Sequence, residues 1–160
     1  QTTPGWRLAA SPQQAMDEVL RGIAHWPKDR MAVVGSSLGG FYATWLAERL
    51  GCKAALLNPA VHPARDLADY IGDNALWHEP EQSFRFDPAF VHELLAQEVA
   101  NISRPERYFA VIARGDEVLD WREMTGHYPG AKIKLLAAGD HALSDFAQHL
   151  DDILAFLALA

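Results

Sequence analysis

The run Gly35-Ser36-Ser37-Leu38-Gly39 has the residue types and spacing of a turn that presents a serine for nucleophilic chemistry. A serine hydroxyl is a poor nucleophile unless it stands outside a regular element, beside a base and near donors for an oxyanion. In Gly-x-Ser-x-Gly, the two glycines give room where neighbouring backbone packs closely, so the serine can adopt strained backbone angles. Ser37 has a glycine at both offsets, and we predict that it is a nucleophile.

Two other interpretations of this run are open. Ser36 is an adjacent hydroxyl, but Gly39 lies three rather than two residues beyond it, so its spacing is wrong. A structural Gly/Ser turn without chemistry is the second alternative. The context favours chemistry, because an apolar strand-like run (31–34) precedes the turn and a helical pattern (41–50) follows it.

A nucleophilic serine in a strand-turn-helix context needs a base, and the chain order is serine, then acid, then histidine. Three of the seven histidines, namely His127, His141 and His149, lie beyond the later predicted strands. His141 alone follows a strand and a turn, in the run 138–142, where a loop can carry the imidazole over the nucleophile. We predict that His141 is the base, with His127 at a helix end and His149 on the solvated face of a helix. The other histidines have no metal-ligand spacing and are expected in exposed or capping positions: His25, His62, His78 and His92.

The acid that orients the histidine is expected just after the strand that precedes the histidine strand. The run Gly115-Asp116-Glu117-Val118-Leu119-Asp120 lies there. Asp116 directly follows the glycine, and we predict that it is the acid. Asp120 is the alternative, although it begins the next helix and suits an N-cap. Glu117 is expected to point in a different direction from both.

The oxyanion formed during acyl chemistry requires two hydrogen-bond donors. The first expected donor is the backbone N–H of Leu38, the residue after the nucleophile, at the N-terminus of a helix whose dipole favours an anion. The second should come from a loop after an earlier strand. The sequence shows no His-Gly loop before Ser37.

Strand-like and helical segments alternate along the chain. Ser11-Pro12 with Gln14 predicts a capped amphipathic helix, and Ser144 predicts the start of the last helix. Apolar runs predict four strands: 31–34, 53–57, 108–113 and 132–136. Helices are expected at 41–50 and around 122–124, and the last helix is expected to bury Phe146, Leu150, Ile153, Leu154 and Leu157. This alternation predicts a three-layer α/β fold with a mostly parallel sheet.

Residues 62–101 interrupt the alternation within a predicted single domain that spans residues 1–160. A helical turn is expected at 66–70 and a helix at 90–99. The polar stretch 74–88 is expected to be irregular and contains Trp77, Phe84 and Phe86. Insertions at this point of an α/β sheet often form a lid over the site. A loop and helix packed on one edge is an equal alternative.

Composition narrows the class of protein. The net charge of −7 and pI near 5.4, with no Lys/Arg cluster, argue against nucleic acid as a partner. Cys52 is the single cysteine, which excludes a disulfide framework and a cysteine metal site, fits the cytoplasm and suits a small buried apolar residue. No apolar run approaches the roughly 20 residues of a membrane span, and residues 1–4 lack a signal pattern. We therefore expect a cytoplasmic protein without a membrane span, and the sequence does not indicate its oligomeric state.

Four runs together resemble the YqiA/YcfP-like family of bacterial esterases, which are small cytoplasmic α/β hydrolases. They are Val33–Leu46, Leu57-Asn58-Pro59-Ala60-Val61, Gly115–Asp120 and Gly139-Asp140-His141-Ala142. The resemblance implies that Ser37 is the nucleophile, Asp116 the acid and His141 the base. It also implies hydrolysis of a small-molecule acyl ester or thioester through an acyl-enzyme, without a cofactor or metal. Asn58 and Pro59 match the family and are expected to bind substrate by shaping the floor beside the nucleophile, or to form a plain strand-end turn.

The chain departs from that family at its front. Members open with a strand and a His-Gly-Phe loop that supplies the second oxyanion donor, and this unit does not precede Ser37 here. The resemblance therefore implies an N-terminally truncated, three-layer α/β-hydrolase-like fold, or an incomplete oxyanion hole and weak activity, since one donor is worth about 10²- to 10³-fold in rate. Two further hypotheses use the same fold. An acyltransferase would use the same triad. A non-catalytic binding protein would not need an oxyanion hole, which would account for the absent loop.

Overall fold

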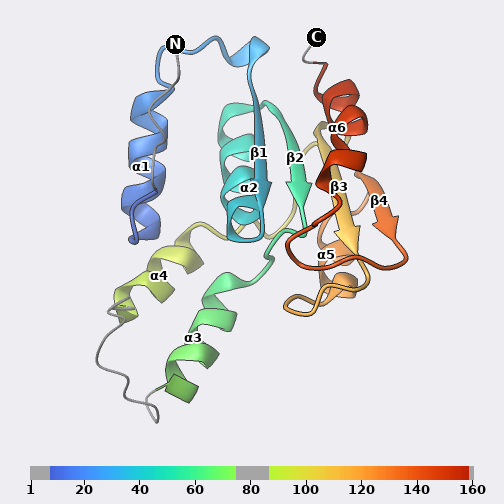
Figure 1. Ribbon diagram of the computed structural model, residues 1–160. Helices are drawn as coiled ribbons and strands as arrows, with labels where there is room; N and C mark the ends of the chain where they lie inside the picture. Colours follow the sequence, from blue (N-terminus) through green and yellow to red (C-terminus); the bar gives the residue numbers. More distant parts are fainter. Residues whose placement is uncertain (1–7, 75–86, 159–160) are drawn as a thin grey trace. The chain divides into compact units, whose positions relative to one another are not determined.

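The computed structural model describes residues 8–74 and 87–158, and the chain divides into two compact units (Figure 1). One unit comprises Gln1–Trp26 and Ala64–Gln97, and the other comprises Pro27–Pro63 and Glu98–Ala160. All the residues predicted to carry chemistry fall in the second, larger unit.

The larger unit is built on a parallel sheet with the strand order β1-β2-β3-β4 (Figure 1). Its strands are β1 (Ala32–Ser36), β2 (Lys53–Leu57), β3 (Tyr108–Ala113) and β4 (Lys132–Leu136). The last three have the predicted bounds, whereas β1 continues to Ser36, where it pairs with Leu57. Because the strands are parallel, the loops that follow all four of them leave at one edge of the sheet.

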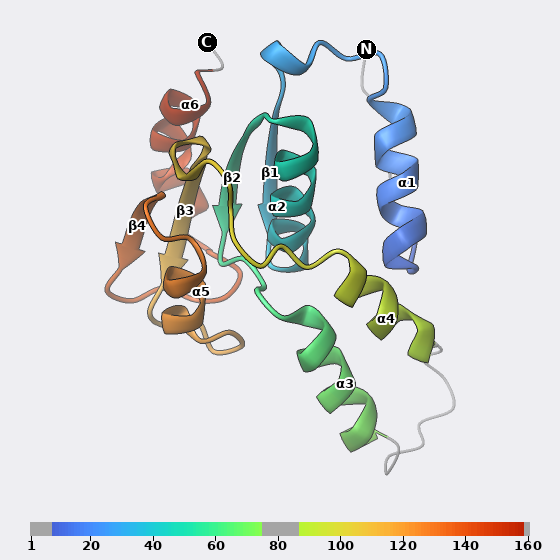
Figure 2. The ribbon, with the colours of Figure 1, turned by 180° about the vertical axis from the view of Figure 1, so that it is seen from behind.

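Helices cover both faces of this sheet. α2 (Leu38–Leu50) and α5 (Trp121–His127) lie on one face, and α6 (Leu150–Leu157) lies on the other (Figures 1 and 2). Single turns of 3₁₀ helix occur at η1 (Lys28–Arg30), η2 (Pro105–Arg107) and η3 (Phe146–Gln148). The three-layer α/β prediction is thus confirmed.

The side chains of β2 and β3 alternate between two cores, as strands buried on both faces require. On the α2 and α5 face the core includes Ala54, Leu56, Tyr108, Ala110, Ile112 and Met124. On the α6 face it includes Ala55, Leu57, Phe109, Val111, Ile153 and Leu157. Cys52 belongs to the first core, which confirms its prediction as a small buried residue.

The smaller unit contains α1 (Pro12–Gly22), α4 (Pro88–Ala96) and most of α3 (Pro63–Asn74). The predicted cap of α1 is confirmed, because the Ser11 hydroxyl oxygen accepts a hydrogen bond from the Gln14 N–H at 3.2 Å. The same hydroxyl donates to Glu93 of α4 at 2.9 Å, and the Gln97 amide donates to the Pro12 carbonyl at 2.9 Å. Polar contacts at the start of α1 therefore join it to α4.

The last helix differs from its prediction. α6 begins at Leu150, after η3, and Ser144 donates its hydroxyl hydrogen to Asp140 rather than capping a helix. Ile153 and Leu157 are buried as expected, but Phe146, Leu150 and Leu154 are exposed. The positive φ of Leu143 (51°) turns the chain before a continuous helix can form.

The middle segment is more helical than predicted. α3 spans twelve residues where a single turn was expected. α4 begins two residues earlier and ends three residues earlier than the predicted helix 90–99. Trp77, Phe84 and Phe86 lie outside the described residues. A lid at 62–101, and a single domain over the whole chain, stay predictions. Within the described ranges no helix is long and apolar enough to cross a membrane.

Candidate active site

Ser37 stands alone between strand and helix. β1 ends at Ser36, α2 begins at Leu38, and Ser37 itself has φ 54° and ψ −120°, a combination that non-glycine residues rarely adopt. The Ser37 carbonyl accepts a hydrogen bond from the Ala60 N–H at 2.9 Å, which fixes the turn to the segment after β2. The serine is thus held in the strained geometry that the spacing predicts for a nucleophile.

The glycines around Ser37 have separate roles. A Cβ on Gly35 would overlap the Gly39 carbonyl, so the strand and the helix could not meet. We expected Gly39 to make room in the same way, but a Cβ there would meet nothing within 4 Å. Gly40 is the second close approach, because a Cβ on it would fall 2.7 Å from the Cβ of Pro59.

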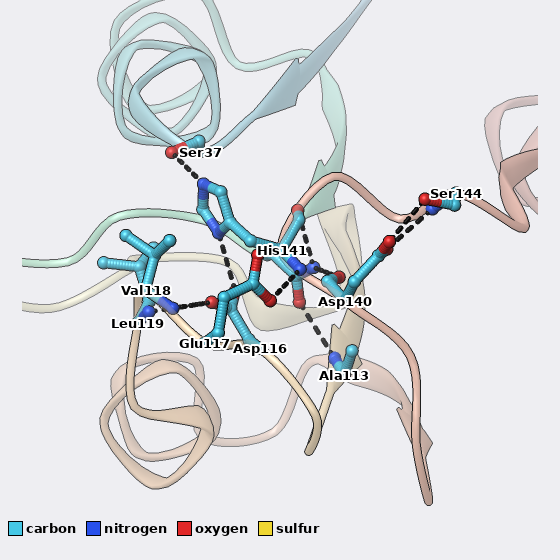
Figure 3. A network of polar contacts seen from close by, with 10 residues as sticks. Ser37, Ala113, Asp116, Glu117, Val118, Leu119, Asp140, His141 and Ser144 are labelled. Atoms are coloured by element: carbon cyan, nitrogen blue, oxygen red, sulfur yellow. Dashed lines mark hydrogen bonds and ion pairs between the residues drawn. The ribbon is translucent and has the colours of Figure 1, made fainter.

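His141 connects the serine to the predicted acid (Figure 3). Its Nε2 lies 2.9 Å from Ser37 Oγ, and its Nδ1 lies 2.8 Å from Asp116 Oδ2. A carboxylate only accepts hydrogen bonds, so Nδ1 carries the imidazole hydrogen and Nε2 accepts from the serine hydroxyl. The structure therefore brings together the three residues that were predicted as nucleophile, base and acid.

Asp116 is held in place by the chain that follows it. Its side chain is 0% exposed, whereas that of His141 is 20% exposed. Asp116 Oδ1 accepts hydrogen bonds from the N–H groups of Val118 and Leu119, both at 2.8 Å (Figure 3). With Oδ1 held by the main chain, Oδ2 is left to face the imidazole.

The loops that carry the acid and the base touch each other. A Cβ on Gly115 would overlap the Gly139 carbonyl, and Gly139 itself has φ 98°. The His141 N–H donates to Glu117 Oε2 at 3.0 Å (Figure 3). The sequence does not predict this contact of Glu117, since no local pattern shows that a loop 24 residues later offers it an N–H.

Asp140 closes the turn that contains His141. The Ser144 hydroxyl and N–H both donate to its carboxylate, the latter at 2.8 Å. Hydrogen bonds from the Ser144 side chain and main chain hold the pKa of Asp140 below its usual value. At neutral pH this exposed carboxylate is therefore ionised and acts as an acceptor that shapes the loop.

Asn58 and Pro59, the residues expected to bind substrate, are fully buried. Both amide hydrogens of Asn58 are donated to the main chain, to the carbonyls of Asp140 at 3.0 Å and His141 at 3.1 Å. Pro59 packs beneath Gly40. Direct substrate binding by either residue stays a prediction, and in the structure both residues contact other parts of the chain.

Leu38 occupies the position expected of the first oxyanion donor. It is the first residue of α2, and its N–H has no hydrogen-bond acceptor among the described residues. No second donor is assigned within ranges 8–74 and 87–158. The same ranges contain no group of three or more His, Cys, Asp or Glu side chains placed to hold a metal ion.

The rejected alternatives lie elsewhere. Asp120 accepts a hydrogen bond from the Arg122 N–H at 2.9 Å and caps α5, as its alternative interpretation predicted. Ser36 is exposed at the end of β1. His149 was expected on a solvated face, but it is buried and pairs with Asp145.

The remaining histidines do not approach Ser37 in the described hydrogen-bond network. His127 packs near His62, and burial, followed by the nearby His62, lowers the pKa of His127. His25 and His92 are exposed as expected, and His78 lies outside the described residues.

Comparison with known proteins places this chain in a family. The family model described as "Uncharacterised protein family (UPF0227)" matches residues 3–158. The chain belongs to UPF0227. A UPF0227 protein of Yersinia enterocolitica is 24% identical over 148 residues, which cover 92% of this chain and 76% of that protein. The resemblance drawn from the sequence is thereby confirmed for the family, while UPF0227 membership leaves the activity open.

Solved structures similar to this UPF0227 chain establish the fold. The mouse alpha/beta hydrolase domain-containing protein 10 aligns with a TM-score of 0.62 and 18% identity, over 92% of this chain and 70% of its own. Acetyl xylan esterase 1 from Thermoanaerobacterium aligns with a TM-score of 0.56 and 15% identity, over 99% of this chain and 61% of its own. The UPF0227 chain therefore has an α/β-hydrolase-like fold, and at these identities the likeness concerns the fold alone.

Proposed function

We propose that this chain is a serine hydrolase that cleaves small carboxylic esters or thioesters through an acyl-enzyme on Ser37. The observation that carries the proposal is the continuous contact from Ser37 Oγ to His141 Nε2 and from His141 Nδ1 to Asp116. The strained backbone of Ser37 supports it, because such strain persists mainly where function requires it. An esterase and other hydrolases among proteins of the same fold are consistent with it.

In the proposed reaction, Ser37 Oγ attacks the acyl carbonyl while His141 Nε2 takes the hydroxyl proton. Asp116 keeps the Nδ1–H tautomer and stabilises the imidazolium. The carbonyl oxygen becomes an oxyanion and accepts a hydrogen bond from the Leu38 N–H at the N-terminus of α2, whose dipole favours the negative charge.

The tetrahedral intermediate then collapses. The bond to the leaving alcohol or thiol breaks, His141 returns its proton to that group, and the acyl group stays on Ser37. Water, deprotonated by the same imidazole, then attacks the acyl carbonyl. The bond between that carbon and Ser37 Oγ breaks, His141 returns the proton to Oγ, and the carboxylic acid leaves. Each turnover thus consumes one water molecule and regenerates the Ser37 hydroxyl.

Labelling with a fluorophosphonate tests the proposal. Such a probe phosphonylates a serine only when its base is in place. We expect peptide mapping to find the label on Ser37, and both Ser37→Ala and His141→Ala to abolish it. Ser36→Ala is the matched control, one residue away, and should label at the wild-type rate. A folded wild-type chain that never labels, or one that labels at Ser36, would contradict the proposal.

The substrate class is then determined by comparing the hydrolysis of p-nitrophenyl esters with short and medium acyl chains and of acyl thioesters. We expect a burst of one leaving group per Ser37, followed by slower turnover. Added alcohol or amine acceptors distinguish hydrolysis from acyl transfer, because an acyltransferase would form the acceptor's ester or amide instead of free acid.

A further inference from the structure

The side chain of Asn58 joins three segments at the carboxyl edge of the sheet. It follows β2 directly, and its Oδ1 accepts a hydrogen bond from the Ala113 N–H at 2.8 Å, at the end of β3. Its Nδ2 donates to the carbonyls of Asp140 and His141, in the loop after β4, at 3.0 and 3.1 Å. The Asn58 amide thus connects the end of β3, which leads to Asp116, with the loop that carries His141.

This position is demanding for the residue that fills it. Asn58 is 0% exposed and has φ 41°, a left-handed conformation in which asparagine is several-fold enriched over most other residues. A buried amide must find partners for its hydrogens, and here both partners are carbonyls of the His141 loop. The requirement for asparagine is therefore twofold: the backbone angle, and a side chain with an acceptor on one side and two donors on the other.

The loop that carries His141 is irregular, and its internal hydrogen bonds join Asp140 to Leu143 and Ser144. Residues 137–145 form no helix or strand, and the loop contains two positive φ angles, at Gly139 and Leu143. Glu117 holds the His141 N–H from one side, and Asn58 holds the His141 carbonyl from the other. The main-chain N–H and C=O of the base are thus each fixed by a side chain from a different loop.

We propose that Asn58 is a positioning residue for His141, an inference that rests on the proposed function of the Ser37 site. Asn58 acts on the imidazole through the loop backbone and does not touch the reacting atoms. Proton transfer tolerates little displacement, and a misplacement of about 1 Å can lower a rate about 10²-fold. The buried amide sets the imidazole between Ser37 and Asp116 before any substrate arrives.

Two substitutions at Asn58 test the proposal. Asn58→Asp keeps the size and the acceptor for Ala113 but replaces the donor by an oxygen that repels both carbonyls. Asn58→Gly permits the positive φ but removes the side chain. We expect the rate of fluorophosphonate labelling at Ser37 to fall about 10- to 100-fold in both. Asn58→Ser retains one donor and should label at an intermediate rate; it also provides a milder variant if the first two fold poorly.

The control must lose buried hydrogen bonds without touching the loop. Thr44 in α2 donates to the Gly40 carbonyl and shares a 2.9 Å hydrogen bond with Tyr128. Thr44→Val removes both contacts and should lower the melting temperature while leaving the labelling rate within about twofold of wild type. A general loss of stability would instead slow labelling in Thr44→Val as well.

A second readout separates this inference from the proposed function. In ¹⁵N-histidine NMR spectra we expect His141 of the wild type to be a single tautomer protonated at Nδ1, and the Asn58 variants to show exchange or a mixture. This comparison needs no catalysis, so it decides the positioning role even if wild-type Ser37 never labels. Folded Asn58→Asp and Asn58→Gly proteins with the wild-type labelling rate and imidazole signals would overturn the inference.

Discussion

At the scale of single residues, Ser37 has a backbone conformation that costs stability. A non-glycine residue with positive φ carries a strain of about 1–2 kcal/mol. Ser37→Gly relieves that strain and Ser37→Ala keeps it, so the glycine variant should be the more stable of the two by up to about 1 kcal/mol. Denaturant unfolding of both variants measures the difference, and a glycine variant less stable than the alanine variant by about 0.5–1 kcal/mol, the ordinary cost of glycine, would show that the turn is not strained.

The acid can be tested with two aspartates four residues apart. Asp116→Asn keeps the shape of the side chain, but its amide can donate to the imidazole and favour the wrong tautomer. We expect ester hydrolysis and labelling to fall by about 10³- to 10⁴-fold. Asp120→Asn is the matched control, because Asp120 caps α5 and, within the described part of the chain, forms no hydrogen bond or ion pair with His141. A large loss in Asp120→Asn with little loss in Asp116→Asn would reassign the acid to Asp120.

At the scale of elements, the approach of two loops sets the distance between Asp116 and His141. Gly115→Ala places a Cβ on the Gly139 carbonyl and forces the loops apart. We expect the hydrolytic rate to fall about 10²-fold, since the Asp116 and His141 contact depends on this approach. Gly126→Ala, in α5, meets nothing within 4 Å and should leave the rate unchanged. A Gly115→Ala protein with wild-type kinetics would show that the loops adapt.

Away from the site, Glu48 ties α2 to β3 in a pH-dependent way. It accepts hydrogen bonds from Ser103 N–H and Oγ and from Tyr108 Oη. Burial raises the pKa of Glu48, but the hydrogen bonds from Ser103 and Tyr108 outweigh it and the pKa lies below its usual value. A carboxyl group with a lowered pKa stabilises the fold above its unfolded-state pKa of about 4.3 and loses that contribution as the pH falls through the folded value.

The melting temperature should therefore fall less steeply below about pH 4.3 in Glu48→Gln than in the wild type. Glu106→Gln is the control, because Glu106 is exposed and no hydrogen bond to its side chain is found among the described residues. Thermal melts from pH 6 to about pH 3 give the slopes. Parallel curves for wild type and Glu48→Gln would contradict the linkage.

A helix or strand could be predicted from the sequence when neighbouring residues determine it. β2, β3 and β4 were predicted at their observed bounds, since strands buried on both faces form continuous apolar runs. The prediction that the last helix begins at Ser144 was wrong. Serine is a common helix cap, but Ser144 instead donates a hydrogen bond to Asp140 in the loop that carries His141. The support given by Asn58 and Glu117 could not be predicted, since their partners lie 82 and 24 residues away and are main-chain atoms.

At the scale of the whole molecule, the parallel sheet assembles the site. Ser37 and His141 are 104 residues apart in sequence, and they meet because each follows a strand of the same sheet at its carboxyl edge. The proposed triad, the Leu38 N–H and the Asn58 amide all belong to the larger unit. The arrangement of these groups therefore depends on the integrity of the sheet.

The same sheet predicts how copies of the chain associate. Among the described residues β1 pairs on one side only, with β2, and Val34 in its centre is 53% exposed. An unpaired strand edge with exposed apolar side chains favours pairing between copies, and the net charge of −7 opposes it at pH 7. We expect association to increase with concentration and as the pH approaches the pI near 5.4.

Val34→Lys should suppress this association, because a lysine on an edge strand disfavours pairing. Val118→Lys makes the same change of charge on a 64% exposed loop valine and should associate more than Val34→Lys. Sedimentation velocity of the three proteins at both pH values measures this, and equal association of the two lysine variants would mean that charge alone, rather than the β1 edge, governs the contact.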